Sequence, residues 1–272
     1  MKSFSSDMPK KTNLHTFVIC AYKESEFIEE CILSLKAQTI RSNIIMVTST
    51  PSAFLEDIAN RYDIPLFVNE GESGITQDWN FGLSCVKTKY ATVAHQDDIY
   101  EPEYTRYLLS RMVQEKKPII AFSDYGELRN GEKVLNNKML KIKRLMLLPI
   151  KPYFTARSVF LRRFSLAFGD AICCPSVMFA MDNVSLPIFQ NHFRSCEDWE
   201  AWEKLSKLKG SFLYVSEPLV YHRIHEDSET TKIIGDGKRS EENLVMFKKF
   251  WPDIVARWIN KLYNSSEKSN KL

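Results

Sequence analysis

The 272-residue sequence lacks any run of about 18 consecutive apolar residues, so we expect no membrane-spanning helix. It lacks a CxxC pair among its six cysteines, and a bridge between the adjacent Cys173 and Cys174 would be strained, so we expect reduced, mostly buried cysteines. No apolar segment follows the lysines of the opening MKSFSSDMPKKTN, which predicts a cytoplasmic protein without a secretory signal. A large charge excess is also absent: 37 basic against 34 acidic residues gives +3, which argues against a nucleic-acid partner.

What the sequence does contain is an ordinary globular composition, with 44% hydrophobic and 26% charged residues. This composition excludes disordered, collagen-like and coiled-coil proteins. A chain of this length can bury roughly three quarters of its unfolded surface, so it needs neither a metal nor a disulfide in order to fold.

The first half of the chain alternates short, dense apolar runs with amphipathic segments. The apolar runs predict strands at 16–22, 43–48, 65–69, 90–94 and 119–123. The amphipathic segments predict helices at 24–38, 51–62, 75–86 and 102–115, the second capped by Ser49 or Thr50 with Pro51 at its first position. The dipeptide Asn130-Gly131 indicates a hairpin or tight turn. This alternation predicts an α/β fold with right-handed crossovers and a mainly parallel sheet flanked by helices.

Ligands of such sheets bind beyond the carboxyl ends of the strands. That rule selects three segments, Ala21–Glu24, Val47–Ser52 and His95–Asp98. No GxGxxG follows the first strand, which argues against a dinucleotide oxidoreductase.

Adjacent carboxylates follow the fourth strand in the segment VAHQDDIYEP. Asp97 and Asp98 repel each other at a strand end unless a cation neutralises them, and divalent cations prefer oxygen ligands of this kind. The alternative is that Asp98 caps the helix that begins near Pro102 while Asp97 is solvated.

A second acidic pair, Glu197 and Asp198, lies in SCEDWEAWEKL at the start of a predicted helix. These acids either stabilise the helix N-terminus or supply a general base beside Trp199 and Trp202.

A third polar cluster is EPLVYHRIHEDSETT, where His222 and His225 flank Arg223. Two histidines and an arginine after a strand-like run favour contact with a phosphate or a metal about as strongly as a structural role.

The segment 133–169 contains nine basic residues, no acidic residue and many interleaved apolar residues. One interpretation is a pair of amphipathic helices that pack on the sheet and expose a basic face. The other is a surface for anionic lipid headgroups or for a lipid-linked diphosphate acceptor.

Five motifs in this order resemble glycosyltransferase family 2, whose members have the GT-A (Rossmann-like) fold. The motifs are FVICAYKESEFIEECILSLKAQT, DWNFGL, HQDDIYEP, CEDWEAW and EPLVYHRIHEDSET. The likeness covers roughly Thr16 to Thr231. It implies a GT-A domain at 14–231, between a flexible tail at 1–13 and a C-terminal helical extension at 232–263, with a second tail at 264–272. In the extension we expect an amphipathic helix at 241–263 that Pro252 kinks or divides.

The resemblance implies an inverting transfer of a sugar from a nucleotide-diphospho-sugar, with UDP-sugar as the expected donor, to a hydroxyl group. Implied donor contacts are Ala21, Tyr22, Glu24, Ser49, Asn80, His95, Asp97 and Arg223. Implied ligands of Mn²⁺ or Mg²⁺ are Asp97, Asp98 and His225, and the implied catalytic base is Asp198. Weaker acceptor or sugar contacts are Ser176, Glu197 and Trp199, although Ser176 also fits an ordinary turn. The expected acceptor is a glycan or a lipid-linked molecule of bacterial surface-polysaccharide synthesis.

Two departures from the family pattern stand out. The turn after the second strand, VTSTPS, has no acid, so Ser49 or Thr50 would have to replace the usual base contact with a hydroxyl. His95 stands where the family carries the first acid of its Asp-x-Asp segment, and a histidine ligand favours Mn²⁺ slightly over Mg²⁺. These departures motivate two alternatives, a GT-A-like binding module without catalysis and a nucleotidyltransferase.

Overall fold

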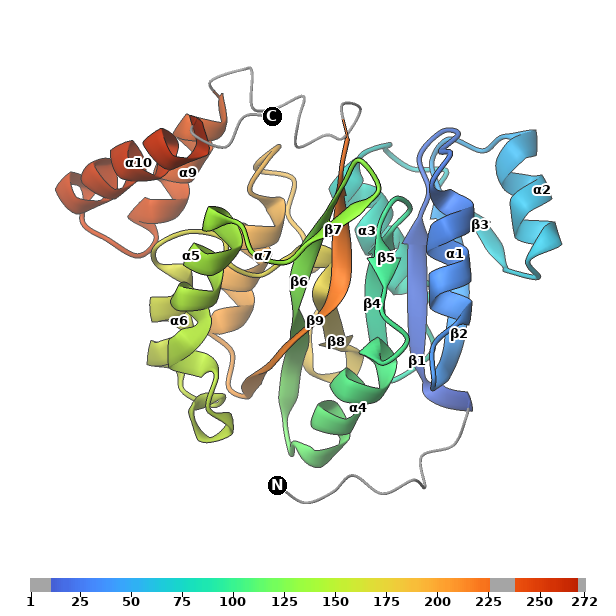
Figure 1. Ribbon diagram of the computed structural model, residues 1–272, viewed down its shortest axis with the longest axis horizontal. Helices are drawn as coiled ribbons and strands as arrows, with labels where there is room; N and C mark the ends of the chain where they lie inside the picture. The colour runs from blue at the N-terminus through green and yellow to red at the C-terminus, as the bar shows by residue number, and fades with distance from the viewer. Residues whose placement is uncertain (1–10, 226–237, 269–272) are drawn as a thin grey trace.

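The computed structural model describes residues 11–225 and 238–268 and shows a central twisted sheet with helices on both faces (Figure 1). The sheet order is β3-β2-β1-β4-β8-β6-β9-β5, with β7 paired to β6. Its strands are β1 (Lys11–Cys20), β2 (Arg41–Thr48), β3 (Leu66–Val68), β4 (Tyr90–His95), β5 (Ile99–Tyr100), β6 (Pro118–Arg129), β7 (Glu132–Val134), β8 (Val177–Ala180) and β9 (Ser211–Ile224). The order and the helices confirm the expected α/β architecture.

The sheet is mainly parallel, as the alternating pattern predicts. Among the first four strands every pair is parallel: β1 pairs with β2 and with β4, and β2 pairs with β3. β8 runs antiparallel to both β4 and β6, so β6 has the direction of β4, and β9 pairs with β6 in parallel. The carboxyl ends of β1, β2, β4 and β9 therefore lie at one edge of the sheet.

The helices cover the two faces of this sheet. They are α1 (Ile28–Lys36), α2 (Ala53–Arg61), α3 (Ile75–Ser84), α4 (Tyr104–Gln114), α5 (Lys138–Leu147), α6 (Val159–Leu166), α7 (Glu197–Ser206), α9 (Lys238–Lys248) and α10 (Asp253–Lys268). Short 3-10 turns are η1 (Leu148–Ile150), η2 (Tyr153–Thr155), η3 (Cys174–Ser176) and η4 (Met181–Asn183).

Two hydrophobic cores result from this covering. On one face, Phe17 and Ile19 of β1 pack with the buried sides of α1, α2 and α4. On the other, Val93 of β4 and Ile120 of β6 pack with α3, α7 and the C-terminal helices. Strands buried on both sides are apolar at consecutive positions, which is why they could be read from the sequence.

Most predicted elements are present, with corrected boundaries. Ser52, not Ser49 or Thr50, caps α2 and accepts a hydrogen bond from the backbone N–H of Leu55. β1 begins at Lys11, inside the expected tail at 1–13. Asn130 and Gly131 have positive φ values of 49° and 80° and close the hairpin between β6 and β7.

The C-terminal helices belong to the core rather than forming a separate layer. Pro252 separates α9 from α10, as expected, but α10 continues to Lys268, beyond the predicted end at 263. Met246, Phe247 and Ala256 are fully buried in the second core. The expected Ser/Thr segment after His225 and the outermost tail residues at 1–10 and 269–272 lie outside the described residues.

Within the described residues, no helix combines the length and the apolar character that crossing a membrane requires.

Candidate active site

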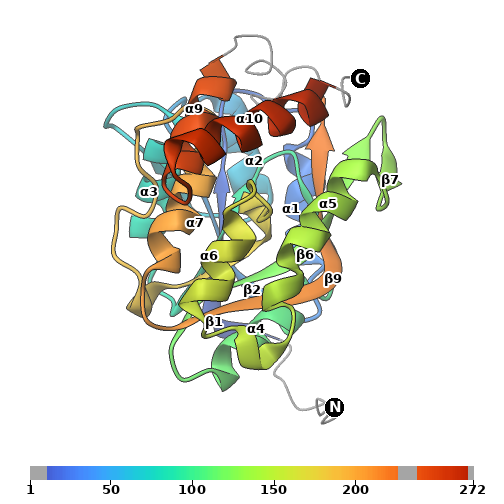
Figure 2. The ribbon, with the colours of Figure 1, turned by 90° about the vertical axis from the view of Figure 1, so that its left-hand side faces the viewer.

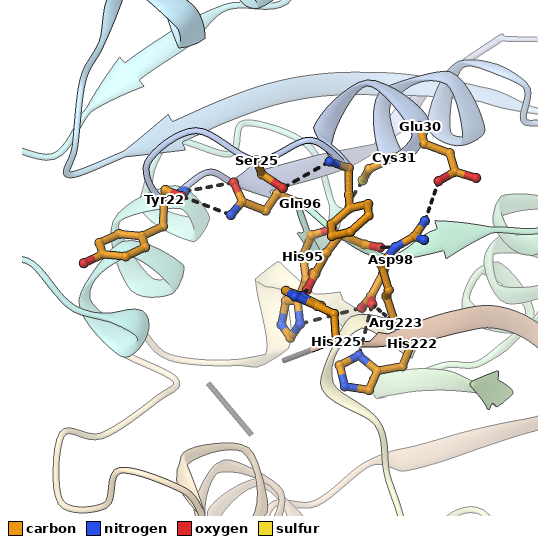
Figure 3. A network of polar contacts seen from close by, with 12 residues as sticks. Tyr22, Ser25, Glu30, Cys31, His95, Gln96, Asp98, His222, Arg223 and His225 are labelled. Atoms are coloured by element: carbon orange, nitrogen blue, oxygen red, sulfur yellow. Dashed lines mark hydrogen bonds and ion pairs between the residues drawn. The ribbon is translucent and has the colours of Figure 1, made fainter. Parts of the chain in front are cut away.

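A polar network gathers where β1, β4 and β9 end (Figure 3). The register pairs Cys20 at the end of β1 with His95 at the end of β4. The two-residue strand β5 then pairs Ile99 with Tyr221, so the aspartates before β5 face the histidines at the end of β9. The sequence motifs HQDDIY and YHRIH, more than 120 positions apart, therefore meet at one point.

Asp98 is the buried centre of this network. Its Oδ1 accepts hydrogen bonds from the backbone N–H of Arg223 at 2.9 Å and from Nδ1 of His222 at 3.0 Å. Burial raises the pKa of the Asp98 carboxyl, but the positive charge and hydrogen bond of His222 and the charge of His95 outweigh burial and hold it below its usual range. Burial lowers the pKa of His222, but Asp98 reverses that effect and raises it to about 9. The two side chains therefore form an ion pair.

His95 and Asp98 present atoms that the described part of the chain leaves without hydrogen bonds. These atoms are Nε2 of His95 and Oδ2 of Asp98, and both are buried. The His95 ring stacks on Trp79, with 5.2 Å between the ring centroids. One ligand atom from each of His95, Asp98 and His222 lies within 4.8 Å of the others. Imidazole and carboxylate donors at this spacing fit a divalent cation such as Mn²⁺.

Asp97 lies beside this group and pairs with the third histidine. Its Oδ2 is 3.0 Å from Nε2 of His225. The predicted ligands Asp97, Asp98 and His225 are thus brought together, and His95 and His222 lie with them. The sequence placed His222 near the site but did not identify it as a partner of Asp98.

Arg223 has a different contact set from the expected one. Its Nε donates to the carbonyl oxygen of Asp97 at 2.8 Å, and its guanidinium binds Glu30 of α1. The same guanidinium lies 4.3 Å from the centroid of the Phe27 ring, and the residue is 8% exposed. Arg223 thus holds the Asp97 backbone against α1, and its pairing with a diphosphate stays a prediction.

The loop after β1 forms the next part of the strand-end surface. The side-chain amide of Gln96 bonds the backbone of Tyr22 twice, accepting from its N–H at 3.0 Å and donating to its C=O at 3.1 Å. This bonding leaves the Tyr22 ring about half exposed, and Glu24 is exposed after it. Ala21 is buried and its N–H donates to Val47, so it can contact a donor only through its backbone.

The turn after β2 has no acid of its own, but Asp78 of α3 contacts it. The Ser49 hydroxyl donates to Oδ2 of Asp78 at 2.7 Å, and the side-chain amide of Asn69 donates to Oδ1 at 2.7 Å. Asp78 belongs to α3 and is 6% exposed. The turn VTSTPS therefore has a carboxylate beside it, that of Asp78 in α3. Asp78 belongs to the motif DWNFGL, but nothing in the sequence assigned it to the site.

Three predicted contact residues have internal roles. The Asn80 side chain accepts from the N–H groups of Ile188 and Phe189 and donates to the Phe189 carbonyl, so it orders the chain before α7. Ser176 is fully buried and donates to the carbonyl of Cys173, as the ordinary-turn alternative requires. Trp199 is 1% exposed and donates to a backbone carbonyl, so a sugar cannot stack on it. These three contacts are corrected to structural roles.

Asp198 lies at the first turn of α7 and is paired with a second carboxyl. Its Oδ1 accepts from the N–H of Trp199 at 2.8 Å, and its side chain shares a hydrogen bond with Asp170. Burial and the negative charge of Asp198 raise the pKa of Asp170 well above its usual range, while Lys143 of α5 lowers it. The two neighbouring carboxyl groups therefore interact directly, and the negative charge of one raises the pKa of Asp170.

Cys173 lies between the two acidic clusters. Burial raises the pKa of its thiol, and the charges of Asp98, Asp170 and Asp198 raise it further. The chain around Cys173 contacts the elements that carry both clusters: the Tyr100 hydroxyl of β5 donates to the carbonyl of Pro175, and the Trp202 indole of α7 donates to the carbonyl of Ile172. The sequence offered one signal for Asp170, since it is the first acid after the acid-free segment 133–169.

Glu197 is adjacent to the carboxyl pair but has a different environment. It is 9% exposed, and burial, followed by the charges of Asp198 and Glu242, raises its pKa to about 8. It is therefore mostly neutral at neutral pH.

Comparison with known proteins relates the chain to one family and one fold. Residues 16–179, more than half of the chain, match the family described as Glycosyl transferase family 2. An uncharacterized glycosyltransferase of Rickettsia felis is 25% identical over 93% of this chain and 40% of its own length. One of Haemophilus influenzae is 27% identical over 42% of this chain and 37% of its own length. The chain thus spans about two fifths of the curated relatives that it matches.

Solved structures show the same fold at low sequence identity. The crystal structure of S. aureus TarS 1-349 in complex with UDP-GlcNAc has a TM-score of 0.63 and 14% identity, covering 90% of this chain and 70% of that one. Mannosyltransferase PcManGT from Pyrobaculum calidifontis, in complex with GDP-Man and Mn²⁺, has a TM-score of 0.59 and 11% identity, covering 92% of this chain and 70% of that one.

Proposed function

Because the chain belongs to glycosyl transferase family 2 and has the GT-A fold, we propose that it is a metal-dependent, inverting glycosyltransferase. It moves a sugar from a nucleotide-diphospho-sugar to a hydroxyl group. The similar structures named above hold UDP-GlcNAc in one case and GDP-Man with Mn²⁺ in the other. We propose a UDP-sugar as the donor of this chain.

The observation that carries the proposal is that two acidic clusters adjoin one segment of chain, 172–175, which contacts both β5 and α7. The cluster of Asp97, Asp98 and the histidines fits a cation, and the carboxyl pair of Asp170 and Asp198 fits proton transfer. A glycosyl transfer needs both functions on either side of the anomeric carbon. A binding module without catalysis would need only the first.

On the donor side, Tyr22 and Glu24 would contact the base and ribose, and Ser49 with Asp78 would provide the polar edge of the same pocket. Asp97, Asp98 and His225 would hold the metal, with His95 and His222 beside them. Bound there, a divalent cation would stabilise the negative charge of the departing nucleoside diphosphate. Arg223 would keep Asp97 in place by bonding its carbonyl.

On the acceptor side, Asp198 would act as the base. It accepts the proton of the acceptor hydroxyl while that oxygen forms a bond to the anomeric carbon. The bond from that carbon to the diphosphate oxygen breaks on the opposite face, so the configuration inverts. Asp170 would be a positioning residue, because its carboxyl shares a hydrogen bond with that of Asp198.

The first test is a thermal-shift panel with UDP, GDP, CDP and dTDP, each with and without Mn²⁺. A ligand at about 100 times its dissociation constant adds roughly 2.7 kcal/mol, which corresponds to a few degrees in a domain of this size. We expect UDP to give a shift that requires the metal and that Asp97→Asn abolishes. The matched control is Asp63→Asn, an exposed acid after α2 that lies outside the site. Metal-independent shifts, or equal shifts in both variants, would contradict the metal assignment.

The second test separates catalysis from binding. Asp198→Asn should keep the nucleotide shift and lose transfer to a panel of sugar acceptors by about 10²–10⁴-fold. Retained transfer would contradict the assignment of the base. Donor binding without turnover in the unmodified protein would support the binding-module alternative that His95 motivates, and release of pyrophosphate would indicate a nucleotidyltransferase.

We also propose that the acceptor is a glycan or a lipid-linked molecule of bacterial surface-polysaccharide synthesis. The basic segment 133–169 supports an association with the anionic inner face of the cytoplasmic membrane. That association does not require a membrane-spanning segment.

A further inference from the structure

Large apolar side chains are exposed on α5, α6, α10 and the turns that connect the first two. Phe154 is 85% exposed, Ile254 83% and Phe160 75%. Leu145, Leu148 and Trp258 are also more than half exposed. We name these six residues the aromatic face. Single exposed apolar residues are ordinary in folded proteins, but a group of this size marks an interaction surface.

These residues lie on one side of the molecule. Figure 2 shows α5, α6 and α10 together on the side that faces the viewer. A line of ring contacts runs from α6 toward the C-terminal helices: Phe160 stacks on Phe164, Phe164 contacts Phe168, and Phe168 lies 5.4 Å from Trp251. The rings of α6 are therefore in contact, through Phe168, with the turn between α9 and α10.

The charges around the aromatic face have one dominant sign. Lys138, Lys141 and Lys151 are exposed between its apolar residues, and the segment 133–169 has no acid. On α10, the exposed acid Asp253 is already paired with Lys248 and Arg257. Apolar rings among lysines match an anionic bilayer, where rings enter the interface and ammonium groups bind phosphates. A protein partner would need a complementary acidic surface, whereas an anionic bilayer matches both the exposed apolar side chains and the lysines.

The aromatic face also adjoins the acceptor side of the proposed reaction centre. Helix α5 carries Leu145 on this face and Lys143 beside Asp170. Gly169, which precedes Asp170, lies against Tyr263 of α10, because a Cβ at this glycine would come within 2.6 Å of that ring. The same helices thus line the exposed surface and support the carboxyl pair.

We propose that the aromatic face docks on an anionic bilayer and that a lipid-carried acceptor reaches Asp198 from the α5 side. This inference deepens the proposed function and rests on it for the second part only. The phosphate or diphosphate of such a carrier would meet the lysines, while its hydroxyl group approaches the base. Docking by itself requires neither donor nor metal.

Vesicle sedimentation tests the docking. We expect the protein to bind vesicles of phosphatidylcholine with phosphatidylglycerol, to bind pure phosphatidylcholine vesicles much less, and to bind more weakly as salt rises. Two variants should each lower the affinity for the anionic vesicles by about tenfold or more. One is the double variant Phe154→Ser with Phe160→Ser, and the other is the triple variant Lys138→Gln, Lys141→Gln and Lys151→Gln.

Matched controls lie elsewhere on the surface. Leu33→Ser on α1 removes an apolar side chain that is 53% exposed on a helix far from α5 and α6 in Figure 1. Lys11, Lys36 and Lys87 to Gln remove three exposed lysines on β1, on α1 and in the turn before β4, away from α5, α6 and α10. Both controls should bind vesicles like the unmodified protein. Equal losses in controls and test variants would overturn the assignment of the face.

Tryptophan quenching by brominated phosphatidylcholine gives a second, local readout. Trp258 is 65% exposed, whereas Trp199 and Trp202 are at most 1% exposed. We expect brominated anionic vesicles to quench fluorescence in the unmodified protein and Trp258→Phe to remove most of that quenching. Binding without any Trp258-dependent quenching would show that lipid contacts another surface. Dimerisation through the face, seen as a concentration-dependent mass that Phe160→Ser abolishes in the absence of lipid, would also overturn the proposal.

These outcomes are separable from failure of the proposed function. The face variants should keep the UDP and Mn²⁺ thermal shift unchanged, because they lie outside the nucleotide site. Loss of that shift in the unmodified protein would refute the donor assignment and leave docking standing. A normal shift without vesicle binding would refute docking and leave the donor assignment standing.

Discussion

Glu197→Gln should change how stability depends on pH. Glu197 is buried beside Asp198 and Glu242, and its pKa in the folded protein is raised from 4.5 to about 8. In the folded state it keeps a proton that the unfolded chain releases above about pH 4.5. Its contribution to stability is therefore complete below pH 4.5 and is lost as pH rises through about 8.

The size of the effect follows from the shift. Each pKa unit corresponds to about 1.4 kcal/mol, so the shift from 4.5 to about 8 sets an upper value on the order of 5 kcal/mol. Water that enters around the ionised carboxylate reduces this, and we expect about 2–4 kcal/mol. Gln has the shape of protonated Glu and does not titrate. The variant should therefore match the unmodified protein near pH 5 and exceed its stability by about this amount near pH 8.5.

Urea unfolding, followed by tryptophan fluorescence at about pH 5, 7 and 8.5, measures the difference. Glu197→Asp is the matched control, because it keeps an ionisable carboxyl. Its free energy of unfolding should still fall as pH rises from about 5 to 8.5, whatever its value at pH 5. A constant difference between Glu197→Gln and the unmodified protein at all three pH values would refute the reasoning. It would mean that Glu197 is ionised in the folded state throughout this range.

Three further predictions concern positioning and packing. Asp170→Asn should keep the rate of sugar transfer within about threefold of the unmodified protein, because the side-chain amide can still donate to Asp198. Asp170→Ala should lower that rate about tenfold or more without changing nucleotide binding. Equal rates of nucleoside diphosphate release in the two variants would contradict the positioning role. Arg162→Met should lower the free energy of unfolding in urea by about 3–5 kcal/mol. The fully buried guanidinium donates to three backbone carbonyls at and after the end of α7, and the variant leaves them without a donor. A loss below about 1 kcal/mol would show that water replaces the guanidinium. Gly82→Ala should lower the free energy of unfolding by about 1–3 kcal/mol, because the new Cβ would lie 2.4 Å from Cγ1 of Val18. An unchanged midpoint of urea unfolding would mean that α3 moves freely away from β1.

The alternation of elements was readable because it rests on local chemistry. Buried parallel strands such as β4 are apolar at consecutive positions, and the helices show one apolar side. The hairpin at Asn130 and Gly131 followed from residues that tolerate positive φ. The cap of α2 was misplaced by a few residues, because Ser49, Thr50 and Ser52 are chemically equivalent until Ser49 is committed to Asp78.

The candidate site was predicted in outline and corrected in detail. Asp97, Asp98 and His225 were identified by their position at strand ends, and the structure brings them together. Arg223 could not be distinguished from a phosphate ligand, because its partners Glu30 and the Asp97 carbonyl come from other elements. Trp199 and Ser176 looked accessible in sequence and are buried, since only packing decides which side of a helix or turn faces the core.

The sequence by itself determined the alternation of strands and helices in the first half, the strand ends where polar side chains gather, and the acid-free basic segment 133–169. These properties depend on residues that are close together in the chain. Only the tertiary structure decided that Asp170 lies beside Asp198, that Asp78 of α3 bonds the Ser49 hydroxyl in the turn after β2, and that α6 and α10 lie on the same side of the molecule. Hydrogen bonds and packing between distant segments form only when the sheet aligns their ends, and no local pattern encodes that alignment.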